Sequence, residues 1–304
     1  MRILLLLLFP AILPLALPTT VLAQKKPDLR SYEDSLTANG AQIVNGRDAS
    51  ERFEADSQFT RTLVRALKEP YSFEYPFDSL QNVSHLYAPD SSFRVFTWEV
   101  MVSEDSYRRH GAIQMRTPDG SLKLFALIDR TDATDHPLDT VTNNTYWIGN
   151  IYYRIVLKKY LGKNYYTLLG YDEHNLASTR KWIEVLTFDA EGKPVFGGRY
   201  FVFNAGDPVQ PGPIDRYMIE YKKDCGARIQ YDPDLGLIIV DHLISESNEP
   251  EKKYTLVPDG DYEGFRWVNG KWVHINKVFS QKLQNGQAPV PQPLKTPPRV
   301  GGHE

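Results

Sequence analysis

Residues 146–203, YWIGNIYYRIVLKKYLGKNYYTLLGYDEHNLASTRKWIEVLTFDAEGKPVFGGRYFVF, contain four successive strand-like runs with a turn between each pair. Residues 150–160 alternate between two rows, as expected of a strand, because successive side chains of a strand point to opposite faces. One row is Ile151, Tyr153, Ile155 and Leu157, and the other is Tyr152, Arg154, Val156 and Lys158. Turn residues at 161–164 and 189–193 separate later runs. The stretch therefore predicts strands joined as hairpins.

Strand patterns continue on both sides of this stretch. Residues 92–102 alternate, and the turn Thr117-Pro118-Asp119-Gly120 precedes another run at 121–128. Further runs occupy residues 216–221, 227–231, 237–244 and 265–279. Nearly every connection has hairpin length, so a parallel sheet with crossover helices is excluded. The pattern predicts a mainly β fold, an antiparallel meander of about ten to twelve strands that forms a barrel or a sandwich, with a small propeller-like fold as the alternative.

Residues 24–70 are predicted to form one or two α-helices ahead of the strands. Ser31 is the expected N-cap of a first helix, with a break at Asn39-Gly40. A second helix is expected to begin at Ser50 and to stop at Pro70. Its apolar stripe consists of Phe53, Phe59, Leu63, Val64 and Leu67. Helices placed in this way cover an open edge or the mouth of a β domain, and a helix that binds a partner is the alternative.

The two ends of the chain have compositions unlike the rest. Residues 1–23 combine one Arg, an apolar run and the small residue Ala23 two positions after Val21, which is typical of a secretory signal peptide. Prolines interrupt the apolar run, so an uncleaved anchor is the less favoured alternative. Residues 284–304 are rich in proline and predict a disordered tail. This division leaves residues 71–283 as the β domain.

Cysteine content and charge limit the compartment and the partners. Cys225 is the single cysteine, so the chain forms no internal disulfide. The absence of disulfides is more typical of exported bacterial envelope proteins than of secreted animal proteins. The sequence therefore predicts an exported protein, periplasmic or secreted. The chain carries 35 Lys and Arg against 38 Asp and Glu, without a basic run. We expect an unknown envelope ligand or protein as partner, no nucleic acid, and no transmembrane segment after signal cleavage.

Residues 129–139 form the densest acidic segment and the one candidate metal site in the sequence. Its four carboxylates belong to Asp129, Asp132, Asp135 and Asp139. Hard cations such as Ca²⁺ bind several oxygen ligands that converge from a loop. The spacing differs from that of an EF-hand, because the glycine and the terminal Glu of that motif are missing. A solvated polar loop is the alternative interpretation.

Aromatic residues and one histidine are the candidate ligand contacts. Tyr152, Tyr165 and Trp182 lie in strand-like runs, and His174 follows Asp172 and Glu173 in a connecting segment. Exposed rings commonly stack on ligands, although Tyr and Trp in strands more often fill the core. The sequence contains no nucleophile elbow, zinc-binding His-Glu-x-x-His or phosphate-binding loop, so we expect no cofactor and assign no catalytic residue.

Two segments carry a family resemblance. Residues 92–100, SFRVFTWEV, and residues 165–197, with the motifs GYD and KWIEVL, are similar to uncharacterised exported proteins of Gram-negative bacteria. That group has no assigned activity. The resemblance implies a location in the cell envelope and no particular catalytic residue.

Two functional hypotheses remain open. The first is a non-catalytic protein that binds a ligand or partner through a β-sheet face or cleft. The second is an envelope hydrolase acting on a glycan or peptide with paired carboxylates such as Asp172, Glu173 or Asp241. Glycosidases require two carboxyl groups about 5 to 10 Å apart, an arrangement that sequence spacing does not reveal. Whether a cleft brings such groups together decides between the two.

Overall fold

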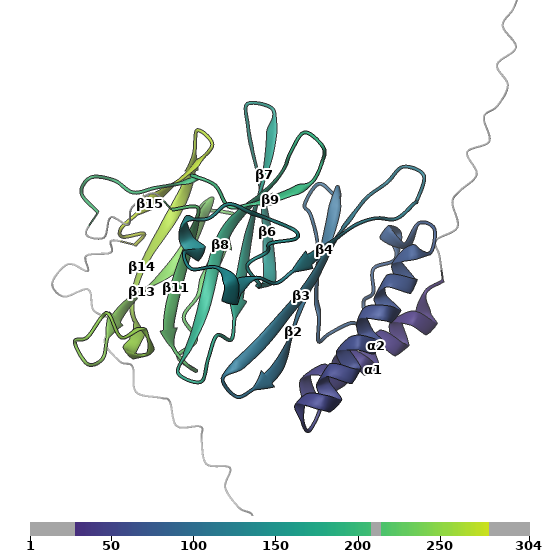
Figure 1. Cartoon of the computed structure of the whole chain (residues 1–304). Coiled ribbons are helices and arrows are strands. Elements are labelled where there is room, and N and C mark those ends of the chain that lie inside the picture. Colours follow the sequence, from purple (N-terminus) through teal and green to yellow (C-terminus); the bar gives the residue numbers. More distant parts are fainter. Residues whose placement is uncertain (1–27, 208–213, 280–304) are drawn as a thin grey trace, which may run out of the picture.

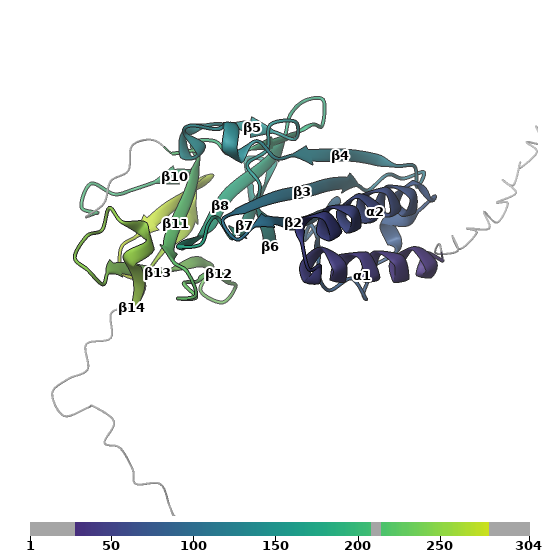
Figure 2. The same ribbon diagram turned by 60° about the horizontal axis from the view of Figure 1, so that its bottom comes forward.

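A computed structural model describes residues 28–207 and 214–279. The predicted signal peptide, residues 1–23, and the predicted tail, residues 284–304, lie outside the described residues. Two helices and three β-sheets stack as layers in the order helices, first sheet, second sheet and third sheet (Figures 1 and 2). The fold is mainly β, as predicted, and the strands of the described residues close no barrel. Of the predicted architectures, the layered sandwich describes the molecule.

The helical layer covers the outer face of the first sheet (Figure 2). Its helices are α1 (Arg30–Asn45) and α2 (Ala49–Lys68). The first sheet has the order β1-β2-β3-β4, and each neighbouring pair is antiparallel. Its strands are β1 (Ser84–Tyr87), β2 (Phe93–Ser103), β3 (Ser106–Met115) and β4 (Lys123–Ile128), preceded by the short 3₁₀ helix η1 (Ser72–Glu74). No helix in the described part of the chain is long and apolar enough to cross a membrane.

The second sheet is the central layer. It has the order β5-β9-β8-β7-β6, and β11 pairs with β8 beside β9. Its strands are β5 (Thr142–Asn143), β6 (Ile151–Tyr160), β7 (Lys163–Asp172), β8 (Ser178–Phe188), β9 (Pro194–Phe196) and β11 (Arg216–Lys222). The 3₁₀ helices η2 (Thr131–Ala133) and η3 (Pro137–Asp139) precede it in the chain. Because both faces are covered, this sheet is apolar on both sides.

The third sheet has the order β10-β15-β14-β13-β12. Its strands are β10 (Phe201–Val202), β12 (Ile229–Asp232), β13 (Leu237–Ser245), β14 (Leu256–Val268) and β15 (Lys271–Ile275), with η4 (Lys253–Thr255) before β14. The short pair of β10 with β15 is parallel, whereas the other pairs of this sheet are antiparallel. The prediction of antiparallel pairing therefore holds for all long strands of the described chain.

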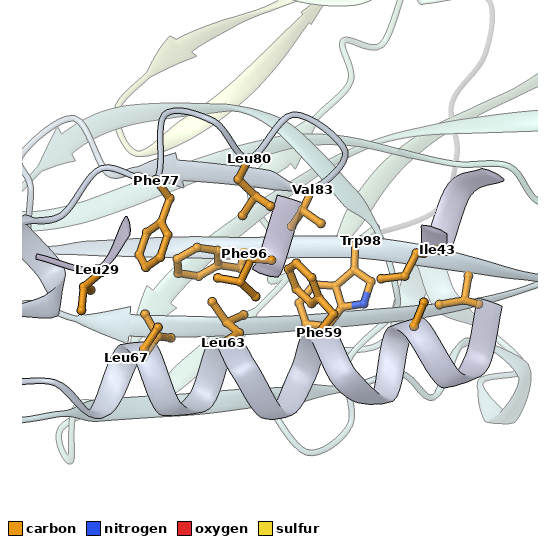
Figure 3. Packing of buried hydrophobic residues seen from close by; sticks show 14 residues of the cluster. Leu29, Ile43, Phe59, Leu63, Leu67, Phe77, Leu80, Val83, Phe96 and Trp98 are labelled. Atoms are coloured by element: carbon orange, nitrogen blue, oxygen red, sulfur yellow. The ribbon is translucent and has the colours of Figure 1, made fainter. Parts of the chain in front are cut away.

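A separate hydrophobic core fills each space between layers. Phe59 and Leu63 of α2 contact Phe96 and Trp98 of β2 in the first core (Figure 3). The second core, between the first and second sheets, contains Phe93, Val95, Ile113, Leu168 and Leu186. The third core, between the second and third sheets, contains Ile183, Val185, Val240, Phe265 and Trp272. Alternate residues of β2 and β8 thus enter cores on opposite faces, as their patterns predict.

The expected start and break of the first helix are wrong. The helix begins at Arg30 after Leu29, without a side-chain cap, and it runs unbroken through Asn39 and Gly40. Gly40 is buried against Leu80 and its neighbours, so tertiary packing keeps the helix continuous despite the low helix propensity of glycine. The second helix begins one residue earlier than expected, because the carboxylate of Asp48 accepts a hydrogen bond from the N–H of Glu51.

Two details of the central stretch also differ from the predictions. The register shifts between Tyr152 and Arg154, so Tyr152 enters the same core as Ile155 instead of the opposite row. The expected fourth long strand, residues 195–203, is divided into β9 and β10, which belong to different sheets. Gly197 and Gly198, with φ of 85° and 134°, make this break, because these φ values favour glycine. The short strands also raise the number of strands in the described residues to fifteen, above the predicted range.

The continuous first helix makes a testable prediction. Gly40→Ala should raise the free energy of unfolding by about 0.5–1 kcal/mol, because glycine disfavours a helix interior and an added Cβ lies at an ordinary 3.7 Å from Cβ of Asn82. Urea unfolding followed by circular dichroism measures the change. Gly46→Ala is the control and should destabilise, since a Cβ there lies 2.8 Å from the carbonyl oxygen of Gln42. Destabilisation by Gly40→Ala contradicts a continuous helix.

Candidate functional site

A cavity of about 460 Å³ lies beside β11, where the second and third sheets meet. Its apolar lining consists of Leu138, Phe203, Ile214, Met218, Ile219, Leu243 and Leu256. Its polar lining consists of Arg216, Tyr217, Glu220, His242, Lys253, Glu263, His274 and Asn276. The volume lies within the range of about 300–1,000 Å³ that is usual for small-molecule sites. Apolar atoms supply most of the surface of the cavity, which is also typical of such sites.

One edge of β11 borders the cavity without a partner strand among the described residues. Just beyond β11, the N–H of Lys223 donates to the carbonyl oxygen of Ala177, next to β8. Bonded residues alternate along an antiparallel pair, so the odd-numbered residues of β11 bond to β8. The peptide groups of Arg216, Met218 and Glu220 therefore point away from β8. They add backbone donors and acceptors to the wall of the cavity.

Asp207, Tyr217, Glu263 and His274 form an ionisable group, the His274 cluster. Tyr217, Glu263 and His274 line the cavity, and Asp207 contacts His274 from outside the lining. Nε2 of His274 lies 3.1 Å from Oε2 of Glu263, and the hydroxyl of Tyr217 donates to Oε1 of Glu263. Nδ1 of His274 lies 3.1 Å from Oδ2 of Asp207 but outside hydrogen-bonding geometry. The His274 side chain is 4% exposed, so one buried imidazole stands between two carboxylates.

The surroundings determine the charge state of this cluster. Burial lowers the pKa of His274, but the carboxylates of Glu263 and Asp207 outweigh burial and raise this pKa above its ordinary value. Burial, and then the negative charge of Glu263, raise the pKa of Tyr217 well above its usual range. Tyr217 therefore remains a neutral hydrogen-bond donor at neutral pH. Both ring nitrogens of His274 face carboxylates, so neither is placed to accept a proton from a ligand.

The other charged groups of the cavity wall already have partners. Nε of Arg216 donates to Oε2 of Glu184 at 2.7 Å, and both side chains are fully buried. Glu220 accepts a 2.8 Å hydrogen bond from Nε of Arg180 and a 2.6 Å bond from the hydroxyl of Ser178. These groups are held in place by the protein. The His274 cluster is therefore the polar part of the cavity with an excess of carboxylates.

A second buried ionisable cluster connects the first and second sheets. Nη2 of Arg109 donates to Oδ1 of Asp172 at 3.3 Å, and the indole N–H of Trp182 donates to Oδ2 at 2.6 Å. Oε2 of Glu99 lies 3.8 Å from Nε of Arg109, and these two atoms make no hydrogen bond. Burial raises the pKa of Glu99 to about 7; Arg109 opposes the rise, whereas Glu173 and Asp172 add to it. None of these residues lines the cavity described above.

The ligand contacts predicted from the sequence lie apart from the cavity. Tyr152 and Trp182 are fully buried and have no exposed surface. Tyr165 is half-buried against Tyr200 and Trp267. His174 is half-buried, with Nε2 3.5 Å from Oε1 of Glu220, and burial, followed by Arg180, lowers its pKa. The structure therefore assigns three of the predicted residues to packing. His174 does not line the cavity, but it lies beside Glu220, which does.

The four acidic residues proposed for a metal do not converge. Oδ1 of Asp129 accepts hydrogen bonds from the N–H and hydroxyl of Thr131, and Asp139 pairs with Arg199 at 2.5 Å. Asp132 and Asp135 lie in η2 and in the segment after it. The described ranges contain no group of three His, Cys, Asp or Glu residues that could hold a metal ion.

The sequence contains a signal for the His274 cluster that composition alone does not reveal. The turn Asn269-Gly270 sets the register of β14 and β15, and it places Phe265 opposite His274. Glu263 is two residues before Phe265, so it lies diagonally across from His274 on the same face. Counting the register outward from the turn predicted at Asn269-Gly270 would therefore have placed Glu263 beside His274 from the sequence alone. The contribution of β11 required the tertiary structure.

Comparisons of the chain with models of protein families, with curated proteins and with solved structures gave no match.

The His274 cluster predicts a pH-dependent stability. The pKa of His274 is raised in the folded protein, so protonation of His274 stabilises the fold. This stabilisation is complete below the unfolded pKa of about 6.5 and is lost as pH rises through the folded pKa. His274→Gln should therefore destabilise the protein more at about pH 6 than at about pH 9, by about 1.4 kcal/mol for each unit of the rise. Urea unfolding at both pH values measures this difference. An equal loss at both values contradicts the prediction.

Glu99 predicts the opposite dependence. Its raised pKa means that ionisation is easier in the unfolded chain, so wild-type stability falls as pH rises from about 4.5 to about 7. Glu99→Gln removes this loss. As pH rises from about 4 to about 8, the free energy of unfolding of the variant should increase relative to that of wild type by on the order of 2–3 kcal/mol. Chemical unfolding across this range measures the gain. The exposed Glu104→Gln is the control and should follow wild type, and a parallel course for Glu99→Gln contradicts the prediction.

Proposed function

We propose that the protein is an exported, non-catalytic binding protein that holds a small molecule with an apolar body in the cavity beside β11. The observation that carries this proposal is the cavity itself, whose surface is mainly apolar and whose wall holds Glu263 and His274 beside Asp207. The signal-like residues 1–23 support export. Apolar burial supplies affinity in such a site, and the polar groups orient the ligand.

The position of β11 supports a preformed site. Tyr217 and Ile219 are fixed in the core between the second and third sheets, whereas Met218 is half-buried in the cavity wall. The outward peptide groups of β11 provide hydrogen bonds that the described chain leaves available. A ligand therefore meets rigid strands and loses little affinity to rearrangement of the protein.

An envelope hydrolase is the second candidate, because a carboxylate and an imidazole line the same cavity. Glu263 and His274 are the two groups concerned. However, both ring nitrogens of His274 face carboxylates, and Glu263 already accepts hydrogen bonds from Tyr217 and His274. General acid–base catalysis needs a group that reaches the substrate proton directly or through one water. Because Glu263 and His274 are already occupied by each other and by Tyr217 and Asp207, we favour a binding function over a catalytic one.

Filling the cavity tests the binding function. Leu243→Trp adds volume inside the cavity and should weaken binding of an apolar probe such as hexanol by about tenfold or more. A tenfold loss of affinity corresponds to a loss of about 1.4 kcal/mol of binding free energy. Ile244→Trp is the matched control, because Ile244 is exposed and lies outside the cavity lining. NMR titration of purified protein measures both affinities.

The same proteins separate binding from catalysis. Equal affinity of both Trp variants and wild type contradicts a binding site in the cavity. Turnover of a peptide, ester or glycoside substrate that is lost in Glu263→Gln replaces the binding proposal with the hydrolase. Thermal unfolding of each variant establishes that a loss of binding is not a loss of fold.

A further inference from the structure

The charges of the His274 cluster identify the polar group of the ligand. Asp207 and Glu263 contribute two carboxylates, of which Glu263 lines the cavity, and His274 between them carries at most one positive charge. The cluster therefore keeps one formal negative charge, and it keeps two when His274 is neutral. Burying a charge without a partner is unfavourable, so a cation that enters the cavity gains more here than it does in water.

Among the described residues, no lysine or arginine of the cavity wall neutralises this excess. The guanidinium of Arg216 is taken by Glu184, and His242 pairs with Asp259 at 2.8 Å. Lys253 is exposed, and its Nζ donates to the carbonyl oxygen of Pro250 at 3.0 Å. Within the described residues, neither Asp207 nor Glu263 forms an ion pair with Lys or Arg.

Glu263 also has acceptor capacity to spare. Each carboxylate oxygen carries two lone pairs. Within the described chain, Oε1 accepts only from Tyr217 and Oε2 only from His274. The Glu263 side chain is 18% exposed, and it lines the cavity. One further donor on each oxygen can therefore be accommodated without displacing the existing partners.

Aromatic rings flank the same position. The rings of Phe203 and His274 lie 4.9 Å apart, and the rings of Phe203 and Tyr217 lie 6.4 Å apart. Both Phe203 and Tyr217 line the cavity beside Glu263. The faces of aromatic rings attract cations and tolerate the carbon atoms bonded to an ammonium nitrogen. Carboxylate and rings together suit an alkylammonium better than a hydrated inorganic cation.

We propose that the cavity binds an organic cation, a primary ammonium attached to an apolar chain, with the ammonium on Glu263. The apolar chain contacts Ile219, Leu243 and Leu256. This inference rests on the proposed binding function, and it adds the chemical class of the ligand. Charge-assisted hydrogen bonds contribute about 1.5–3 kcal/mol each, which corresponds to a preference of about tenfold to a hundredfold over an uncharged analogue.

Three probes of equal chain length test the class of ligand. Hexylamine, hexanol and hexanoate are titrated separately into purified protein at neutral pH and followed by NMR. We expect hexylamine to bind about tenfold or more tightly than hexanol, and hexanoate to bind most weakly. Equal affinities leave the cavity as a binding site but overturn the cation proposal. Absence of binding by all three overturns the proposed function as well.

Variants locate the contact. Glu263→Gln keeps the shape of the side chain and should reduce the preference for hexylamine over hexanol from about tenfold to near equality. Thermal unfolding establishes that this variant is folded. Tyr217→Phe removes a donor from Glu263 and should retain the preference for hexylamine. Lys253→Met removes a basic group from the cavity wall and should also retain the preference for hexylamine. If the wild-type protein instead prefers hexanoate, and this preference disappears in Lys253→Met, the proposal is overturned.

Discussion

The buried ion pair between Glu184 and Arg216 is the interaction on which the central layer depends. Both side chains are fully buried, and Nε of Arg216 donates to Oε2 of Glu184 at 2.7 Å. An ion pair in such surroundings persists only when its remaining donors and acceptors are satisfied. Glu184 also accepts a hydrogen bond from the hydroxyl of Tyr152, and the other two guanidinium nitrogens donate to oxygens of Pro137, Thr140, Thr142 and Phe196.

This network fixes the strand that borders the cavity. Arg216 is the first residue of β11 and is paired with Glu184 of β8 in the register of the sheet. Its guanidinium contacts the chain at η3 and at the end of β9, so three segments distant in sequence converge there. A Cβ at Gly197 would lie 3.2 Å from Nη1 of Arg216, which explains why glycine suits that position. The polar network therefore sets both the course of the chain and the wall of the cavity.

The sequence predicts the layers better than it predicts the site. Apolar alternation is local, so the faces of β2 and β8 could be assigned from residues such as Phe96 and Val185. The bulge at Tyr152 and the break at Gly197 could not, because each depends on packing against another layer. The predicted aromatic contacts Tyr152 and Trp182 became core residues for the same reason. Propensity places such rings in strands but does not decide between core and surface.

The cavity arises from the way the chain divides its strands between two sheets. One side of β8 is shared by β9 and β11, and between these strands the chain crosses to the third sheet as β10. β11 then returns to the second sheet with one edge unpaired among the described strands. His274 on β15 and Glu263 on β14 face this edge from the opposite layer, and Tyr217 joins them through Glu263. A layered sandwich with a continuous β9–β11 strand would have buried this position in core side chains, so the crossing of the chain is what provides room for a ligand.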